Sequence, residues 1–445
     1  MNLDCYHIMR ATSPPSPQAL CAMSTTITGS QPFSNTFAAT PQRWIIIPAD
    51  QMQKIQQIMD LDQAPDLGYN ITTAMAPYLC TGSLKNWTND GMKVYYQVGG
   101  TPYVNPADGA RIDFPFIERW VSTTSGTLPD TKIEQTINEL PSGYYYLRGS
   151  FIACTQTDAD IVISGVKFYA GDQSVDIATG NGTPKRYALR VKVTDGTLTF
   201  GLDIKSTPAN WVAMDNLQLF YDGTEEEYLS LATPCHPVRI PMVNTTFDQW
   251  KTDGWELSDN WSLNYNNGAE HELFNWPYAE WWVNAAAQAD RSMSQTLTLR
   301  AGYYTLDAAV EATRQDQPEL EVSGVTLRFD DEQIACHTAN KAPQWFSVDK
   351  TVEAGEHTVG LYVQSTDANW VAVDNYVLRY HGPHKLIQGD INADGQVTIA
   401  DVTALVNIIL GKNDQQTDTC TADINADGQV TIADVTALVN IILGK

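Results

Sequence analysis

Oxygen-bearing side chains stand at alternate positions in two identical segments near the C-terminus. In the first segment, Asp390, Asn392 and Asp394 precede Gly395, and Asp401 follows as the twelfth residue. The second segment repeats this arrangement from position 423, 33 residues further on. Ca²⁺ is a hard cation that takes about six to eight oxygen ligands, and this spacing is that of a calcium loop of EF-hand type. The sequence therefore predicts two bound calcium ions.

Each loop supplies a complete set of predicted oxygen ligands. The side chains at positions 1, 3, 5 and 12 and the backbone carbonyl at position 7 would face the ion, and position 9 would bind directly or through water. The predicted ligands are Asp390, Asn392, Asp394, Gln396, Thr398 and Asp401 in the first loop and Asp423, Asn425, Asp427, Gln429, Thr431 and Asp434 in the second. Position 12 is Asp where Glu is usual, and its shorter side chain would weaken calcium binding or admit magnesium.

A helix is predicted directly after each loop. Apolar residues recur at helical spacing within 402–410 and again within 435–443. Gly411 and Gly444 stand where a helix C-cap is expected. The stretches before the loops, 380–384 and 413–422, are turn-like or polar and predict no helix. Each repeat is therefore a loop followed by a helix.

These loops and helices resemble the dockerin type I module, and the expected domain covers residues 386–445. The likeness is to versions common in gut Bacteroidetes. The resemblance implies calcium-dependent docking of an extracellular polysaccharide-degrading protein onto a cohesin-like or cell-surface partner. Loop positions 10 and 11, where clostridial modules carry small hydroxyl residues that select the cohesin, are Ile399-Ala400 and Ile432-Ala433. The resemblance thus carries over the calcium ligands but not the cohesin-selecting residues.

Composition excludes two classes of partner. The chain of 445 residues has a net charge of −25 and a pI near 4.5. Binding to nucleic acid needs clustered Lys and Arg that neutralise phosphates, and an anionic membrane surface also attracts basic segments. No apolar run reaches the length of a membrane-spanning helix. We therefore expect neither nucleic acid nor a membrane as a partner.

Two features bear on where the protein is located. The seven cysteines are scattered without C-x-x-C spacing, which predicts neither a disulfide framework nor a zinc site. Residues 1–31 lack the apolar core of a secretory signal. Because the dockerin resemblance implies a secreted or cell-surface protein, we expect the natural start to lie upstream of Met1 or to have been assigned wrongly.

The middle of the chain is an older duplication. Gly143-Tyr-Tyr matches Gly302-Tyr-Tyr, and Asn210-Trp-Val-Ala matches Asn369-Trp-Val-Ala, both at an offset of 159 residues. The sequence therefore predicts two homologous units, residues 66–225 and 226–385. Residues 1–65 are expected to be largely disordered, with a short amphipathic helix over 50–62.

Each unit is predicted to be an antiparallel β-sandwich of jelly-roll type. Short stretches such as 295–299 and 358–363 alternate apolar and polar residues, and turn residues follow at short intervals. The fold class is therefore mainly β, with two tandem sandwiches and a small α-helical C-terminal domain. The strand pair ending in Gly-Tyr-Tyr and the closing Asn-Trp-Val-Ala strand resemble galactose-binding-like sandwiches, which implies carbohydrate binding.

An Asp lies at the same place near the end of each unit, at Asp215 and Asp374. In related sandwiches, such an Asp holds a structural calcium with an acidic residue near the first strand, and Asp248 is the predicted mate of Asp374. The alternative is a strand-end carboxylate that accepts backbone hydrogen bonds.

Tryptophan is distributed unequally between the units. Residues 226–385 contain eight and residues 66–225 contain three. Two copies of one fold need similar cores, so the surplus suggests exposed rings that stack on sugars. The predicted contacts are Trp276, Tyr278, Trp281 and Trp345. The alternative is that these rings are buried in the sandwich, as is expected for the shared Trp211 and Trp370.

No catalytic motif is recognisable. A glycosidase needs two carboxylates at a set separation, and nothing frames such a pair, although Glu270 and Glu272 are not excluded. The favoured interpretation is a non-catalytic carbohydrate-binding and docking protein. The alternative is the C-terminal part of a glycoside hydrolase or polysaccharide lyase, and a third possibility is a tail that clamps or anchors without a cohesin.

Overall fold

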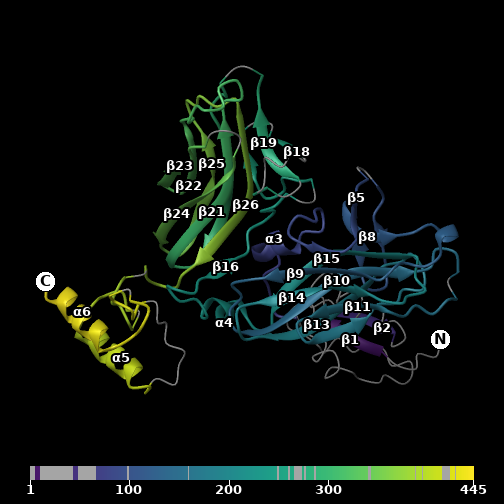
Figure 1. The fold of residues 1–445 in the computed structure, drawn as a ribbon, viewed down its shortest axis with the longest axis horizontal. Coiled ribbons are helices and arrows are strands. Elements are labelled where there is room, and N and C mark those ends of the chain that lie inside the picture. Colours follow the sequence, from purple (N-terminus) through teal and green to yellow (C-terminus); the bar gives the residue numbers. More distant parts are fainter. Residues whose placement is uncertain are drawn as a thin grey trace.

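The fold is given by a computed structural model (Figure 1). It describes residues 6–10, 44–48, 67–97, 100–158, 160–247, 250–258, 261–264, 273–274, 277–284, 287–338, 342–385, 387–392, 394–412, 421–425 and 427–444. The helix predicted over 50–62 lies outside these residues. Near the N-terminus, β1 (Tyr6–Arg10) pairs antiparallel with β2 (Trp44–Pro48), where the sequence analysis expected no strand. Three consecutive isoleucines in β2 account for it, because β-branched residues favour strands.

The first sandwich has a six-stranded and a five-stranded antiparallel sheet among the described residues. Its strands are β3 (Tyr69–Asn70), β4 (Thr88–Asn89), β5 (Lys93–Tyr95), β8 (Phe116–Trp120), β9 (Thr131–Ile137), β10 (Gly143–Cys154), β11 (Val166–Ala170), β12 (Gln173–Asp176), β13 (Lys185–Val193), β14 (Leu198–Ile204) and β15 (Trp211–Tyr221). The strand orders are β13-β10-β15-β8-β5, with β3 beside β15, and β12-β11-β14-β9-β4.

The second sandwich repeats this topology. Its strands are β16 (Val238–Ile240), β17 (Glu256–Leu257), β18 (Ser262–Asn264), β19 (Tyr278–Trp282), β20 (Arg291–Leu299), β21 (Gly302–Thr313), β22 (Val325–Phe329), β23 (Glu332–Ala335), β24 (Gln344–Val352), β25 (Gly355–Val363) and β26 (Trp370–Tyr380). The orders are β18-β19-β26-β21-β24, with β16 beside β26, and β17-β20-β25-β22-β23. The predicted fold class, mainly β with tandem antiparallel sandwiches, is confirmed.

Side chains on the outer strands alternate between the core and solvent, whereas the central strands β10, β15, β21 and β26 are largely buried on both faces. In β9, Ile133 and Ile137 are buried in the core, while Lys132, which lies between the buried Thr131 and Ile133, is exposed. The shared Trp211 and Trp370 are also buried, as expected.

The long strand pairs are interrupted at one equivalent point in each sandwich. The register shifts next to Arg148 on β10 and next to Asp307 on β21. On the partner strands, Asn216 and Asn375 have φ angles of 50° and 56°, a left-handed conformation that Asn tolerates better than most residues. The Asp-Asn motif that both copies share therefore marks a β-bulge.

One hydrophobic core extends through both sandwiches. The helix α4 (Glu225–Leu229) joins them, and the ring of its Tyr228 lies 5.5 Å from that of Tyr69 and 5.4 Å from that of Tyr221. The Tyr228 hydroxyl donates a hydrogen bond of 3.1 Å to the backbone carbonyl of Arg239 in the second sandwich. Because Tyr228 and Leu229 of this linker are buried in the common core, the two sandwiches pack against each other and are not joined by a free linker.

The first sandwich also has short helices and a short hairpin outside its two main sheets. They are η1 (Thr73–Met75), α3 (Ala76–Leu79), η2 (Thr123–Ser125) and a hairpin of β6 (Tyr103–Val104) and β7 (Arg111–Ile112). The hairpin covers a small apolar cluster on the outer face of the sheet, around Trp211. In Figure 1, α3 lies on the side of the first sandwich that faces the second.

The cysteines differ in state. Cys235 is disulfide-bonded, which the scattered spacing did not reveal. Cys80, Cys154 and Cys336 are buried free thiols. Burial raises the pKa of the Cys154 thiol to about 11 and that of Cys336 to about 12, so neither forms a reactive thiolate at neutral pH.

The C-terminal domain contains the two predicted helices, α5 (Ile399–Ile409) and α6 (Ile432–Ile442), shown in yellow in Figure 1. They pack around Leu405 and Leu438, which are fully buried. Gly411 and Gly444 follow the helices with φ angles of 62° and 65°, the left-handed conformation of a C-terminal glycine. The predicted order of loop and helix, twice, is confirmed.

Replacement of a single core leucine tests this packing. We expect Leu405→Ala to lower the free energy of local unfolding of α5 by about 2–5 kcal/mol, because it leaves a cavity between the helices. Hydrogen exchange of α5 peptides in the calcium-loaded full chain measures this. Ile399→Ala is the control, since Ile399 is 71% exposed and its truncation should change the value by less than about 0.5 kcal/mol. Equal effects of the two variants would contradict the packing.

Candidate functional site

The first predicted calcium loop is curled around its own acidic side chains. Asp390 accepts hydrogen bonds from the backbone N–H groups of Asp394 (3.1 Å) and Gly395 (2.8 Å). The side-chain oxygen of Asn392 accepts one from Asp394 N–H (3.0 Å), and Asp394 accepts one from Gln396 N–H (2.9 Å). Gly395 has a φ angle of 85°, as the sharp turn at position 6 requires. The three alternate side chains are thus held on the inside of one tight turn.

Asp401 closes the loop. It is fully buried, and one carboxylate oxygen accepts hydrogen bonds from Ile391 N–H (2.8 Å) and Asn392 N–H (3.1 Å). The other oxygen accepts one from Thr398 N–H (2.7 Å), and together Asp401 and Thr398 form the capping box of α5. A single carboxylate therefore links the start of the loop, its end and the first turn of the helix.

The second loop repeats this geometry. Asp434 accepts hydrogen bonds from Ile424 N–H (2.8 Å), Asn425 N–H (3.2 Å) and Thr431 N–H (2.8 Å). Burial raises the pKa of Asp434, but these backbone hydrogen bonds outweigh it and the pKa lies below its usual value. Asp423 accepts from Asp427 N–H and Gly428 N–H as Asp390 does in the first loop. The position-12 carboxylate is thus kept ionised, as a metal ligand must be.

The donor set of each loop fits calcium. Every predicted ligand is a carboxylate, amide, hydroxyl or carbonyl oxygen, with no nitrogen or sulfur that would favour zinc. Across the part of the chain that the structure describes, no group of three or more His, Cys, Asp and Glu side chains is placed to hold a metal by itself. A shell around one ion therefore has to include the amide of Asn392 or Asn425 and the backbone carbonyl at position 7.

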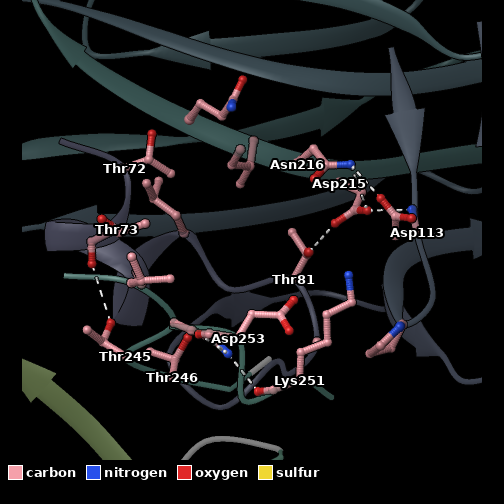
Figure 2. Close-up of a pocket in the computed structure, with 18 of the residues that line it drawn as sticks. Thr72, Thr73, Thr81, Asp113, Asp215, Asn216, Thr245, Thr246, Lys251 and Asp253 are labelled. Atoms are coloured by element: carbon pink, nitrogen blue, oxygen red, sulfur yellow. Dashed lines mark hydrogen bonds between the residues drawn. The ribbon is translucent and has the colours of Figure 1, made fainter. Parts of the chain in front are cut away.

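Asp215 lies in a polar cavity at the junction of the sandwiches, which we call the Asp215 cavity (Figure 2). Its volume is about 340 Å³, and residues 243–246, Lys251 and Asp253 of the second sandwich form one wall. Across it, the Thr245 hydroxyl donates to the Thr73 carbonyl at 3.4 Å. The Asp215 carboxylate accepts hydrogen bonds from the Thr81 hydroxyl and from the backbone N–H of Asp113 at 2.7 Å.

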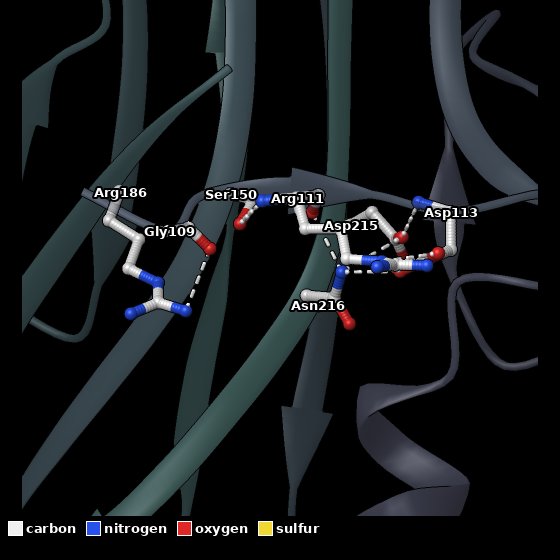
Figure 3. Close-up of polar contacts among 7 residues, drawn as sticks. All are labelled: Gly109, Arg111, Asp113, Ser150, Arg186, Asp215 and Asn216. Atoms are coloured by element: carbon white, nitrogen blue, oxygen red, sulfur yellow. Dashed lines mark hydrogen bonds and ion pairs between the residues drawn. The ribbon is translucent and has the colours of Figure 1, made fainter. Parts of the chain in front are cut away.

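The surroundings of Asp215 agree with the alternative of a hydrogen-bonded strand-end carboxylate. Asn216 donates to the carbonyl of Arg111 at 2.7 Å, and Arg111 pairs with Asp113 at 2.6 Å, so the outer face here is a closed polar network (Figure 3). Asp374 is fully buried. Its predicted mate, Asp248, lies outside the described residues. Calcium in the sandwiches therefore stays a prediction.

Two of the predicted sugar contacts are wrong, because their side chains are buried. Tyr278 is inaccessible and packs on Phe274, with ring centroids 4.9 Å apart. Trp281 belongs to the main core, stacked on Trp261 at 5.0 Å with the Arg291 guanidinium 3.6 Å from its ring. Part of the tryptophan surplus thus fills the sandwich, which is the alternative that the sequence left open. Trp276 lies outside the described residues.

Trp345 is the predicted contact that lies on the surface. It is 50% exposed on the edge strand β24, and it borders a second cavity, of about 540 Å³, which we call the Trp345 cavity. The second sandwich contributes Trp345, Arg239, Leu273, Asp307, Asn375, Val377 and Arg379, and the first contributes Pro77, Tyr78 and Asn86.

The polar residues that surround the cavity together with Trp345 were not predicted from the sequence. Asp307 pairs with Arg379, and Arg379 and Arg239 both pair with Glu139 of the first sandwich, at 3.4 and 2.9 Å. The sequence does contain a difference that could have indicated them: at the positions equivalent to Asp307 and Arg379, the first sandwich has Arg148 and Phe220. Residues that change chemical type between two copies of one fold are candidates for function.

Comparison with known proteins bears on the C-terminal domain. Residues 388–443 match the dockerin type I domain, which confirms the resemblance stated for this region. No curated protein matches the chain. Among the described residues, no helix is long and apolar enough to cross a membrane.

Several solved structures are similar to the sandwiches. One is "TmCBM61 in complex with beta-1,4-galactotriose" (17% identity, 31% of this chain and 97% of that chain, TM-score 0.25). Another is the CBM22-1–CBM22-2 tandem domain of Xyn10C from Paenibacillus barcinonensis (10% identity, 67% and 94%, TM-score 0.25). A third is xanthan lyase from Paenibacillus (12% identity, 68% and 25%, TM-score 0.24). We transfer no property from these proteins to this chain.

The buried Asp215 makes stability depend on pH. Burial raises the pKa of Asp215 to about 7, whereas an unfolded Asp titrates near about 4. The folded state binds the proton more tightly, so the stabilisation is fully present below the unfolded pKa and is lost as the pH rises through about 7. The Asp215→Asn variant mimics the protonated acid. As the pH rises from about 4 to about 7, we therefore expect the melting temperature of the unaltered protein to fall relative to that of this variant. Melting temperatures of the two proteins that change in parallel with pH, measured by calorimetry, would contradict this.

Proposed function

We propose that this chain is a non-catalytic extracellular protein that holds a polysaccharide through its sandwiches and docks onto a partner protein through two calcium-loaded loops. The observation that supports it most is the dockerin type I match over residues 388–443, on two loops in which Asp390 and Asp423 accept equivalent backbone hydrogen bonds. The system in which it acts would be one that degrades extracellular polysaccharide, and its partner would be a cohesin-like or cell-surface protein.

Calcium would be held by one set of oxygens in each loop. Asp390, Asn392, Asp394 and Asp401, with the carbonyl of Gln396, would bind the first ion, and the equivalent residues of the second loop would bind the second. A bound divalent ion neutralises carboxylates that otherwise repel each other within one short turn. Since Asp401 also caps α5, charge repulsion in the loop acts directly on the first turn of the helix.

The helices would present the docking surface. Ile399 and Ile432, at the first position of α5 and of α6, are 71% and 70% exposed, although large apolar side chains are usually buried. They occupy loop position 10, where related modules select their partner. Two equivalent apolar side chains suit a partner with an apolar contact surface rather than the hydroxyl-recognising one of clostridial cohesins.

Glycan binding is proposed for the second sandwich. Trp345 offers a half-exposed indole face beside carboxylate, amide and guanidinium groups, which are the groups that bind sugar hydroxyls in protein sites. The first sandwich has Arg186 at this place, hydrogen-bonded to the carbonyl of Gly109 at 2.9 Å, and so lacks the ring (Figure 3).

Removal of calcium should unfold the C-terminal helices selectively. We expect EGTA to abolish the protection of α5 and α6 from hydrogen exchange in the full chain, while the strands of both sandwiches keep theirs, because the carboxylates repel once no cation lies between them. Adding back excess Ca²⁺ should restore protection. Asp390→Ala should release α5 even in calcium, whereas Asp176→Ala, an exposed carboxylate in the first sandwich, should not. Helices that stay protected in EGTA would refute calcium-dependent folding.

A polysaccharide panel separates the binding protein from an enzyme. We expect affinity gel electrophoresis to show retardation by at least one polysaccharide, with no new reducing ends or unsaturated sugars after long incubation. Product release would show instead that the chain contains a glycoside hydrolase or lyase activity. If no polysaccharide retards the protein while its calcium-dependent folding is intact, glycan binding is refuted but the docking role is not.

A further inference from the structure

Resting on the glycan binding proposed above, we infer that the sugar site is the Trp345 cavity, that both sandwiches build it, and that it takes a neutral sugar chain. A single sandwich would bind a glycan on its own surface. Here the cavity is lined from both sides, by residues that lie far apart in the sequence.

The floor of the cavity is the outer face of the second sandwich. The residues that form it lie on neighbouring strands, since Asp307 on β21 pairs in register with Ser347 on β24 and with Val377 on β26. Trp345 precedes Ser347 by two residues on β24 and therefore points to the same face. Its half-exposed ring gives an apolar platform on β24, and the polar pair of Asp307 and Arg379, with Val377, continues the floor on the neighbouring strands β21 and β26.

The roof of the cavity comes from the first sandwich. Pro77 and Tyr78 belong to α3, and Asn86 follows in the next loop. The Arg239 guanidinium, on the second sandwich, lies 5.2 Å from the ring of Tyr78 and donates to its hydroxyl at 3.4 Å. Lys85 adds a second bridge by donating to the carbonyl of Phe274 at 2.9 Å. These bonds hold roof and floor in one position, so the site does not have to assemble when the sugar binds.

The charges around the cavity are matched. Two guanidinium groups, those of Arg239 and Arg379, lie beside two carboxylates, those of Glu139 and Asp307. Arg239 is almost fully buried in this arrangement. A uronic acid or sulfated sugar would need a cation that is not already paired, because an unmatched buried charge is costly. Hydroxyl groups can instead share hydrogen bonds with ion pairs that are already formed, which favours a neutral sugar.

The duplication indicates one such site in each chain. At the equivalent place in the first sandwich, Arg186 replaces Trp345 and Arg148 replaces Asp307. Arg148 donates to the neutral side chain of Gln218 at 2.9 and 2.7 Å instead of forming the ion pair. The first sandwich therefore contributes a roof to its neighbour and does not repeat the platform.

The test is isothermal titration calorimetry of the calcium-loaded full chain. The probes are β-1,4-linked gluco-, galacto-, xylo- and manno-oligosaccharides, with oligogalacturonate as the acidic comparison. We expect binding of a neutral oligosaccharide at one site per chain. Trp345→Ala on the floor should weaken it about tenfold or more, and Asn86→Ala on the exposed roof should weaken it about threefold or more.

Trp282→Ala is the matched control. Trp282 is 51% exposed on the same sandwich but does not line the cavity, and its indole donates to Gln315 at 2.6 Å. It should bind with the affinity of the unaltered chain. Hydrogen exchange of β21 and β26 should be the same in all three variants, which separates loss of contact from loss of fold.

The outcomes distinguish this inference from the function on which it rests. If no oligosaccharide binds, glycan binding itself is refuted. If Trp345→Ala weakens binding and Asn86→Ala does not, the second sandwich binds alone and the shared cavity is refuted. Loss of binding in Trp282→Ala, with none in Trp345→Ala, would place the sugar elsewhere on the sandwich. Tighter binding of oligogalacturonate than of every neutral probe would refute the neutral class.

Discussion

Burial of Tyr228 and Leu229, in the helix that joins the sandwiches, is the constraint on which the proposed sugar site depends. Tyr228 is fully buried among rings of the first sandwich and bonds to the backbone of the second, within a hydrophobic core common to both. Removing this much apolar surface from water strongly disfavours separation of the two domains. Because the sandwiches keep a fixed relation, a loop of one can serve as the wall of a cavity in the other. Two sandwiches on a free linker would have independent sites.

The C-terminal domain relies on a different kind of interaction. Its apolar core is small, with Leu405 and Leu438 at the centre, and each helix begins at a buried carboxylate that three backbone N–H groups surround. A domain of this size gains little from its core alone, so the proposed bound ions would contribute a large share of its stability. In the proposed function, folding of the docking surface would thereby be linked to calcium, while the sandwiches would remain folded without it.

Comparison of the two sandwiches separates structure from function. Trp211 and Trp370 are buried in both copies, and the Asp-Asn motif marks the same bulge in each, so their retention follows from the fold. On the outer face the copies differ. One has a network of Arg186, Arg148 and neutral partners, and the other has Trp345 beside an ion pair. A duplicated core with diverged faces is what selection for two roles would produce.

The dockerin-type loops, the helices that follow them and the two sandwiches could be predicted from the sequence, because each depends on patterns of residues close together in the chain. Ligands of one loop lie within twelve residues, and helical and strand periodicities extend over only a few more. Strand alternation likewise predicted the sandwich class. Burial was harder to predict, since Tyr278, Trp281 and Trp345 are all aromatic residues of the same unit. The first two proved to be core and the third lies at the surface. The other residues around the Trp345 cavity come from positions as distant as Tyr78, which lines it, and Glu139, which pairs with its two arginines. Only the packing of one sandwich on the other brings them together, because no local pattern encodes contacts across so long a separation.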